Sequence, residues 1–179
     1  FSTENWRRPL DEVRFLMGFN ERLLLTRRDE LHGKGVRVRF IGRRGGRVPA
    51  RVRRRIEETE ELTRDNRRLT LTFAFNYGGR AELVDGIQRL AQDAVDGRVR
   101  PDRIDERMLR RYLYAPDMPD PDLFVRTSGE YRISNYLLWE IAYSELYFTE
   151  TLWPDFRREH LFDAVREFQH RSRRFGAIE

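Results

Sequence analysis

Short strand-like segments and amphipathic helices alternate along this chain, and this alternation constrains the fold more than any other feature of the sequence. Residues 36–40 alternate apolar and cationic side chains, and residues 69–75 alternate bulky and small ones, as half-buried strands do. Apolar residues recur at helical spacing over residues 10–31, 52–66 and 83–94. The pattern predicts an α/β fold with a mostly parallel central sheet surrounded by helices.

The remaining segments are shorter or irregular. Asp105 is expected to cap a short helix that runs to residue 112, and residues 158–175 place apolar side chains on one helical face. The arginine-rich turn 42–46 has no acidic or glycine-cradle motif around it and is interpreted as a solvated loop. Residues 116–122 are rich in aspartate, but three prolines prevent the helix on which a metal-binding aspartate motif would depend.

The composition limits the class of protein and its partners. Charged residues make up 36% of the 179 residues and apolar residues 39%, and the apolar ones lie in periodic runs, so a single folded domain is expected. The absence of cysteine excludes disulfides, thiol chemistry and cysteine-based zinc sites. No signal peptide or long apolar stretch is visible, which predicts a cytoplasmic protein with at most peripheral contact at the inner face of the membrane. A net charge of +5 favours anionic partners: nucleic acid, an acidic membrane surface or phosphorylated small molecules.

The residues that follow the apolar run 123–125 carry the clearest functional indication. Arg126, Arg132 and the hydroxyl of Ser134 come after this predicted buried strand, and Ser134 or Asn135 offers the cap of a following helix. Ligands of open α/β sheets bind at the carboxyl ends of strands, and guanidinium groups bind phosphate oxygens bidentately. The cluster therefore predicts a phosphate or diphosphate site, with solvated arginines and a purely structural cap as the alternatives.

Three blocks of the chain carry a resemblance to a known family. They are FSTENWRRP at Phe1–Pro9, NYGGRAELVDG at Asn76–Gly86 and RTSGEYRISNYLLWEIAYSELYFTETLWPDF at Arg126–Phe156. The chain resembles the cis-prenyltransferases, the undecaprenyl diphosphate synthase family, from its first residue to its closing RRFG. The resemblance implies a Mg²⁺-dependent transferase that condenses isopentenyl diphosphate with an allylic diphosphate and makes Z-configured polyprenyl diphosphates.

The third block supplies the residues that the resemblance assigns to the isopentenyl substrate and to the metal. The diphosphate of isopentenyl diphosphate is expected at Arg126, Arg132, Ile133 and Ser134. Glu145 matches the carboxylate associated with the Mg²⁺ site of the family. A buried ion pair with an arginine is the alternative, and the apolar residues around Glu145 make it the less favoured one.

The first block matches the flexible, substrate-contacting loop of the family. Asn5 matches the residue linked to proton removal, and because an amide is not a strong base we expect Asn5 to orient or relay. For Trp6 the alternatives are a mobile lid over the site and a place in the core. Substrate contacts are expected from Ser2, Thr3, Glu4, Trp6 and Arg8.

The middle of the chain leaves more alternatives open. Gly78 and Gly79 permit either a phosphate cradle or, as the preferred interpretation, a tight turn, and Arg80 either contacts substrate or braces the sheet. A growing prenyl chain needs a dry tunnel, because each buried CH₂ contributes about 0.8 kcal/mol. Candidates for its lining, with ordinary core packing as the alternative, are Leu16, Leu23, Phe73 and Phe75.

One motif of the family is absent from these 179 residues. It is an Asp-Gly-Asn-Gly-Arg-Trp loop at a strand end, which in the family binds the allylic diphosphate and supplies an aspartate. Because the chain begins within a strand pattern, we expect one domain over residues 1–179 that lacks its N-terminal segment. The alternative is a non-catalytic partner subunit of a heteromeric cis-prenyltransferase.

The closing residues bear on the partners of the chain. Arg174, Phe175 and Gly176 resemble an element that reaches the neighbouring subunit's substrate site in related dimers, which predicts a homodimer; a helix C-cap is the alternative. A nucleic-acid-binding module is disfavoured because no aromatic and basic reading surface is evident. Product length depends on the depth of the tunnel, which sequence periodicity does not measure.

Overall fold

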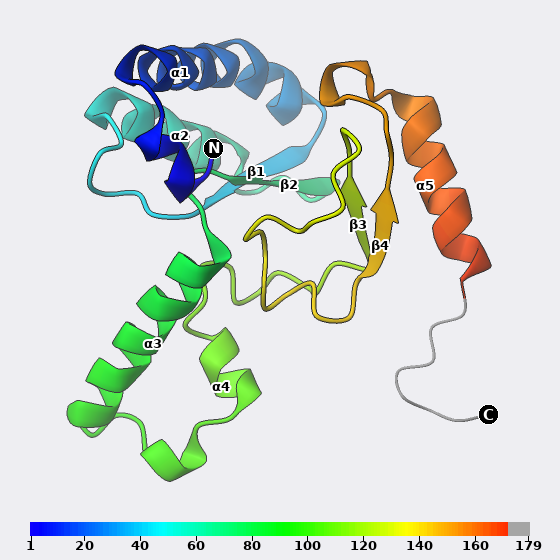
Figure 1. The fold of residues 1–179 in the computed structure, drawn as a ribbon. Coiled ribbons are helices and arrows are strands. Elements are labelled where there is room, and N and C mark those ends of the chain that lie inside the picture. Colours follow the sequence, from blue (N-terminus) through cyan, green and yellow to red (C-terminus); the bar gives the residue numbers. More distant parts are fainter. Residues whose placement is uncertain (172–179) are drawn as a thin grey trace. The chain divides into compact units, whose positions relative to one another are not determined.

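The structure, a computed structural model, describes residues 1–171, without the side chains at positions 20, 23 and 24. Its contacts divide the chain into two compact units, Phe1–Pro116 and Asp117–Glu179. Strands alternate with helices along the chain, and both strand pairs among the described residues are parallel (Figure 1). The predicted α/β class is therefore confirmed, whereas the prediction of one truncated domain over residues 1–179 stays a prediction.

The first unit contains the longer helices. In chain order its elements are η1 (Thr3–Arg7), α1 (Leu10–Gly33), β1 (Val36–Ile41), α2 (Ala50–Thr63), β2 (Leu69–Ala74), α3 (Gly79–Val95), η2 (Pro101–Arg103) and α4 (Glu106–Arg110). Strands β1 and β2 pair from Val36 with Leu69 to Ile41 with Ala74. Ser2 adds a parallel bridge to Tyr77, just beyond the end of β2. The predicted helices and strands of this unit agree closely with the observed ones, and the predicted Asp105 cap is confirmed by its acceptance of the Met108 N–H at 2.7 Å.

The core of the first unit lies between helices α1 and α2 and the strand pair. Helices α1 and α2 contact each other, and both contact β1. Figure 1 shows the two helices on one side of the strands. The buried cluster consists of Val13, Met17, Val48, Val52, Ile56 and Phe75, with Phe1, Trp6 and Phe40 packed against it. The helical spacing of residues 10–31 and 52–66 therefore corresponds to this buried contact.

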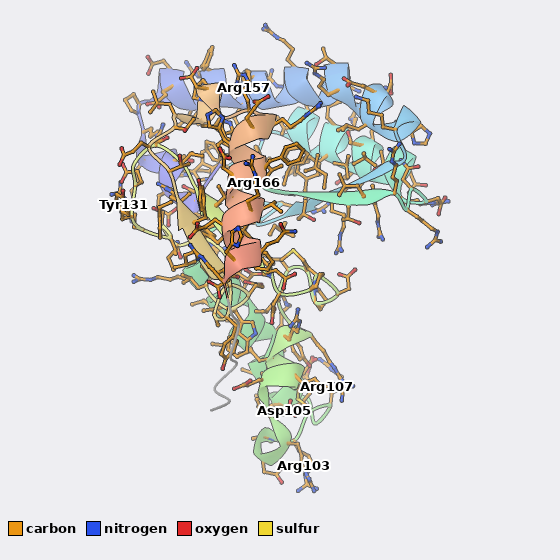
Figure 2. The ribbon with its side chains drawn as sticks, turned by 90° about the vertical axis from the view of Figure 1, so that its right-hand side faces the viewer. Arg103, Asp105, Arg107, Tyr131, Arg157 and Arg166 are labelled. Carbon is orange, nitrogen blue, oxygen red and sulfur yellow. The ribbon has the colours of Figure 1, made fainter. Side chains whose placement is uncertain are left out.

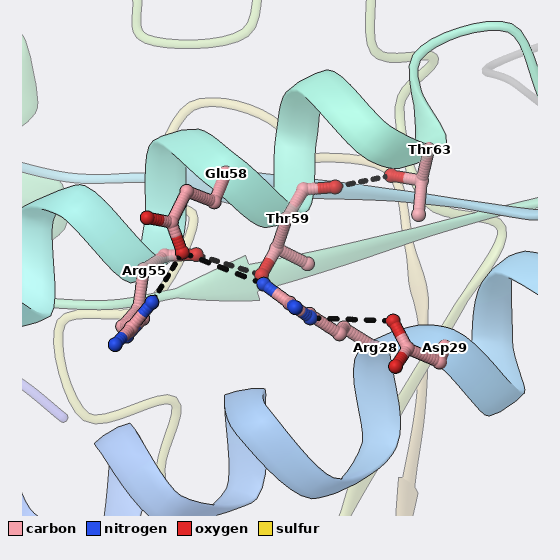
Figure 3. A network of polar contacts seen from close by, with 6 residues as sticks. All are labelled: Arg28, Asp29, Arg55, Glu58, Thr59 and Thr63. Atoms are coloured by element: carbon pink, nitrogen blue, oxygen red, sulfur yellow. Dashed lines mark hydrogen bonds and ion pairs between the residues drawn. The ribbon is translucent and has the colours of Figure 1, made fainter.

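Two buried threonines satisfy polar groups inside this core. The hydroxyl of Thr63 donates to the carbonyl oxygen of Thr59 at 2.8 Å and accepts the N–H of Val38 at 3.0 Å. One turn earlier, the hydroxyl of Thr59 donates to the carbonyl oxygen of Arg55 at 2.7 Å (Figure 3). Because an unpaired polar group in the interior costs about 1–3 kcal/mol, these bonds allow α2 to pack directly on β1.

The second unit contains a shorter strand pair and one long helix. Its elements are β3 (Leu123–Arg126), β4 (Glu145–Phe148), η3 (Trp153–Asp155) and α5 (Arg158–His170). Strands β3 and β4 are parallel, from Leu123 with Glu145 to Arg126 with Phe148, and α5 contacts β4. The strand at residues 123–125 and the helix from residue 158 are thus confirmed. Strand β4 was not predicted.

The predicted helix after Ser134 or Asn135 is wrong. Ser134, Asn135 and Leu137 have φ angles of 50°, 59° and 47°. An α-helix requires φ near −63°, so these three left-handed residues impose a series of turns instead. The segment that links β3 to β4 therefore contains no helix start at which a phosphate group could bind.

Among the described residues, no helix has both the length and the apolar character needed to cross a membrane.

Candidate functional site

The strand end predicted as a phosphate site lies in the second unit, at Arg126. This residue ends β3, and its carbonyl oxygen accepts the N–H of Thr149 at 2.9 Å, so its backbone is held by the strand pair. Its side chain is half-buried and makes no hydrogen bond or ion pair with any residue in the described part of the chain. A partly buried guanidinium without a carboxylate partner is available to an anion.

The loop that follows Arg126 has a defined conformation. Ser128 and Gly129 have φ angles of 70° and 64°. Their N–H groups donate to the carbonyl oxygens of Thr151 at 2.9 Å and Thr149 at 3.0 Å. A Cβ at position 129 would lie 2.7 Å from a carboxylate oxygen of Glu150, so glycine permits this close approach. The loop therefore positions the polar residues after β3 without a helix.

The other residues predicted to bind isopentenyl diphosphate follow in the same loop. Arg132 is exposed and forms an ion pair with Glu130, so this guanidinium has a carboxylate partner. Ser134 is exposed in its left-handed conformation, and Ile133 is half-buried. Tyr131 extends from this loop (Figure 2), with its ring 5.3 Å from that of Phe148. Arg126 thus ends β3 and Arg132 follows in the next loop, and of these two arginines only Arg126 has no partner among the described residues.

Glu145, the predicted metal ligand, begins β4 and is paired with an arginine. Its carboxylate accepts from Arg171 at 3.1 Å, and Arg171 also contacts Glu167 at 3.2 Å and the carbonyl oxygen of Leu146 at 2.9 Å. This is the ion pair that the sequence left open as an alternative. No group of three or more acidic, histidine or cysteine side chains that could hold a metal gathers within the described residues. Mg²⁺ often binds through one or two carboxylates together with substrate phosphates, so Glu145 fits as a single ligand.

The residues of the first block lie in the first unit and pack against the end of β2. The side-chain oxygen of Asn5 accepts the N–H of Ser2 at 2.6 Å. The Trp6 indole donates to the side-chain oxygen of Asn76 at 2.6 Å, and its ring meets that of Phe1 edge-on at 5.0 Å. Trp6 therefore has the core contacts that were one of its two alternatives. Its role as a lid stays a prediction.

Among the other candidates of the first block, Thr3 makes a backbone hydrogen bond, and the side chains of Glu4 and Arg8 are exposed. The Thr3 N–H donates to the carbonyl oxygen of Tyr77 at 2.9 Å. Glu4 and Arg8 are exposed, and Arg8 pairs with Glu12 at 2.5 Å. Their substrate contacts stay predictions.

A large open cleft lies beside this segment, at the carboxyl ends of β1 and β2. Its volume is about 880 Å³. It is lined by Thr3, Trp6, Arg7, Phe40, Ile41, Gly42, Arg43, Arg44, Gly45, Gly46, Arg47, Asn76, Asp85, Arg89 and Tyr114. Two residues predicted to contact substrate, Thr3 and Trp6, are among them. The turn 42–46, which the sequence predicts to be a solvated loop, forms one wall.

One carboxylate in this cleft accepts hydrogen bonds from two other lining side chains. Asp85 accepts from Arg43 at 2.8 and 2.6 Å and from the hydroxyl of Tyr114 at 2.5 Å. The hydrogen bond from Arg43 holds the pKa of Asp85 below its ordinary value. Burial, together with the hydrogen bond to Asp85, raises the pKa of Tyr114 well above its usual range. Asp85 is therefore a charged partner that fixes Arg43, not a proton donor.

Asn76 forms hydrogen bonds with two residues that line the cleft, Trp6 and Arg43. The sequence analysis did not identify it as a site residue. It is buried with a φ of 51°, and besides accepting from Trp6 it donates to the carbonyl oxygen of Arg43 at 2.7 Å. Its own carbonyl oxygen accepts the Arg43 N–H at 3.1 Å. The signal in the sequence was an asparagine directly after a strand and before Gly78, since asparagine tolerates left-handed backbone.

The two glycines after Tyr77 begin a helix. Gly78 is the N-cap of α3, and its carbonyl oxygen accepts the Glu82 N–H at 2.9 Å. Both Gly78 and Gly79 are buried. Their contacts agree with the tight turn preferred from the sequence.

A small apolar cavity of about 100 Å³ lies elsewhere in the first unit, between its long helices and its strands. Two of the tunnel candidates, Phe73 and Phe75, line it, together with Phe1, Arg27, Arg28, Leu31, Val38, Phe40, Ile56, Thr59 and Ala74. Leu16 is not among the lining residues, and the side chain of Leu23 lies outside the described part. The terminal Arg174, Phe175 and Gly176 also lie outside the described residues.

Comparison with known proteins gives consistent matches. The sequence profile of the undecaprenyl diphosphate synthase family matches residues 1–176. A trans,polycis-polyprenyl diphosphate synthase ((2Z,6E)-farnesyl diphosphate specific) of Thermobifida fusca is 55% identical over all 179 residues, which cover 63% of its own length. Isoprenyl transferase 2 of Corynebacterium glutamicum is 54% identical, over 99% of this chain and 72% of its own. The chain thus spans about two thirds of the length of these relatives.

A solved structure supports the same assignment. Lavandulyl diphosphate synthase from Lavandula x intermedia, in complex with dimethylallyl diphosphate, superposes with a TM-score of 0.95 and 34% identity. The match covers 99% of this chain and 76% of the lavender chain. The profile match, the two sequence relatives and this superposition together show that the chain belongs to the undecaprenyl diphosphate synthase family.

Proposed function

We propose that the protein is a cis-prenyltransferase that condenses isopentenyl diphosphate with an allylic diphosphate into Z-configured polyprenyl diphosphates. The observation that carries the proposal is the half-buried Arg126 guanidinium, which ends a parallel strand and has no partner among the described residues. Ligands of α/β sheets bind at such strand ends, and an unpaired guanidinium there is suited to phosphate oxygens. Family membership and the names of the relatives support the same chemistry.

In this proposal the loop after β3 holds the diphosphate of isopentenyl diphosphate. Arg126 binds phosphate oxygens directly, and Arg132 exchanges its ion pair with Glu130 for the ligand. Ser134 offers a hydroxyl, and Ile133 contributes an apolar contact beside it. Asn5 orients the substrate or relays its proton once its side chain leaves the Ser2 N–H.

Glu145 is the residue proposed to hold Mg²⁺. The chemistry supplied by a bound Mg²⁺ would be neutralisation of the departing diphosphate as the allylic cation develops. Glu145 would then contribute one carboxylate oxygen, and Arg171 would have to give up its contact with that carboxylate. The homodimer and the cytoplasmic location also remain predictions.

A product assay tests the proposal. Full-length protein is incubated with labelled isopentenyl diphosphate, Mg²⁺ and allylic diphosphates of several chain lengths, and the products are sized and their double bonds assigned. We expect chain elongation with new Z double bonds. No elongation with any primer would instead favour the non-catalytic partner subunit, and new E double bonds would contradict the proposal directly.

The proposed metal ligand Glu145 has a matched control position in Glu167, because both carboxylates contact Arg171. Glu145→Gln removes the proposed ligand, and we expect the Mg²⁺ concentration at half-maximal activity to rise by about tenfold, which corresponds to about 1.4 kcal/mol. Glu167→Gln disturbs Arg171 alone and is expected to leave the Mg²⁺ titration unchanged. Equal titration curves for both variants would return Glu145 to a structural role.

A further inference from the structure

Among residues 1–171, strand β1 pairs with β2 on one edge and with no strand on the other. The contact beyond the end of the pair shows which backbone groups face β2, because the carbonyl oxygen of Ile41 accepts the N–H of Phe75 at 2.9 Å. Successive residues of a strand direct their backbone groups to alternate sides. The outer edge of β1 therefore carries the N–H and C=O groups of Val36, Val38 and Phe40.

Two side chains of α2 accept N–H groups of this outer edge. The Thr63 hydroxyl accepts the Val38 N–H at 3.0 Å. One turn earlier in the helix, the Glu60 carboxylate accepts the Phe40 N–H at 2.8 Å. Because residues three positions apart lie on the same face of a helix, α2 presents both acceptors to the strand together. These side-chain oxygens take the place of the carbonyl oxygens that a neighbouring strand would offer.

Carbonyl oxygens of the outer edge also have side-chain partners. Asn66, in the segment between α2 and β2, donates its side-chain N–H to the carbonyl oxygen of Val36 at 2.8 Å. Arg44 donates to the carbonyl oxygen of Phe40 at 3.2 Å. Two further bonds of 2.6 and 2.7 Å hold the Arg44 guanidinium on Glu60. Side chains therefore engage both donors and acceptors of this edge.

Charged side chains surround the same edge. A groove of about 320 Å³ lies beside β1 and α2. Apart from Val38, its lining consists of charged residues of both signs: Arg37, Arg39, Glu57, Glu60, Glu61 and Arg64. A strand that approached from this side would displace the water around these groups, and desolvation of charged groups is costly.

We propose that Glu60, Thr63 and Asn66, together with Arg44, close the outer edge of β1 against strand pairing with a second copy of this chain. An open strand edge presents unpaired N–H and C=O groups, and these act as a template for association with another chain. In this protein side chains of the same unit already bind such groups, so a second copy would first have to break those hydrogen bonds. The inference does not depend on the transferase activity, because no residue of the proposed isopentenyl or metal site takes part.

The first test compares two buried threonines of α2, Thr63 and Thr59 (Figure 3). Each hydroxyl donates to the carbonyl oxygen four residues earlier, but only Thr63 also accepts an N–H of β1. Amide hydrogen exchange of the full-length protein is measured residue by residue by NMR. In Thr63→Val, whose new side chain has nearly the same shape, we expect the Val38 amide to exchange about tenfold faster, because its hydrogen bond is lost. Thr59→Val is the matched control and is expected to leave the exchange of this amide unchanged.

The second test measures self-association by sedimentation velocity over a range of protein concentrations. A variant that combines Thr63→Val with Glu60→Ala frees both N–H groups, and we expect its weight-average sedimentation coefficient to rise with concentration more steeply than that of the parent protein. The control combines Thr59→Val with Glu61→Ala, because Glu61 is exposed and pairs with Arg64 at 2.6 Å. It is expected to sediment like the parent protein.

The outcomes separate edge closure from a general loss of stability. Equal association of the two combined variants would overturn the proposal, since the control leaves the edge of β1 intact. Parent-like sedimentation of the Thr63→Val, Glu60→Ala variant would also overturn it, as would unchanged exchange of the Val38 amide in Thr63→Val. If the combined variant does not fold, Thr63→Val alone is carried through both measurements. Because no turnover is measured, loss of transferase activity would not be mistaken for failure of this inference.

Discussion

Gly42→Ala is expected to lower the free energy of unfolding by about 3 kcal/mol or more. Gly42 follows β1 with a φ of +123°, which side chains rarely adopt. A Cβ there would lie 2.1 Å from the carbonyl oxygen of Phe75 and 3.0 Å from backbone atoms of Asn76. These are backbone atoms inside the core, so the clash cannot be relieved by moving a flexible side chain. Urea denaturation of the variant and the parent protein measures the difference.

The same loop offers two controls. Gly45→Ala meets no atom within 4 Å and is expected to change the stability by less than about 1 kcal/mol. Gly46→Ala is equally free of clashes but has a φ of +71°, so about 1 kcal/mol of backbone strain is expected. The close approach at Gly42 is supported if the loss of unfolding free energy is largest for Gly42→Ala, smaller for Gly46→Ala and smallest for Gly45→Ala. A Gly42→Ala variant as stable as Gly45→Ala would contradict it.

Arg126→Ala is expected to raise the KM for isopentenyl diphosphate by about 10- to 100-fold, because a hydrogen bond to a charged group contributes about 1.5–3 kcal/mol. The arginine has no structural partner to lose among the described residues, so the effect on folding should be small. Steady-state kinetics with varied isopentenyl diphosphate at saturating allylic diphosphate and Mg²⁺ gives the value. If kcat falls instead while the KM is unchanged, Arg126 acts in the transition state and not in substrate binding.

Two further variants test whether the effect is specific to the loop after β3. Arg132→Ala is expected to raise the same KM, but by less, because Arg132 must first release Glu130. Arg166→Ala removes an equal charge from α5, where Arg166 pairs with Asp163 at 3.1 Å (Figure 2), and is expected to leave the KM unchanged. Unchanged kinetics in both Arg126→Ala and Arg132→Ala would remove the assignment of this loop to the diphosphate.

Several contacts of the candidate sites could not have been read from the sequence. The Glu145 pair with Arg171 joins residues 26 positions apart, and the Arg43 pair with Asp85 joins residues 42 positions apart. Both need the folded path of the chain before their charges meet. The left-handed angles at Ser134, Asn135 and Leu137 likewise depend on how the segment between β3 and β4 packs. The apolar pattern of this segment resembles a helix turn, and for that reason the sequence predicted a helix there.

The sequence by itself determined the α/β class, the positions of most helices and strands, the Asp105 cap and the resemblance to the family. These features are local, since periodicity and capping act over a few residues and a motif is read in order. Only the tertiary structure decided that Arg126 has no partner among residues 1–171 while Arg132 pairs with Glu130, and that the exposed 42–46 loop forms one wall of a cleft. The physical reason is that the availability of a charge depends on its neighbours in space, and those neighbours come from distant parts of the chain.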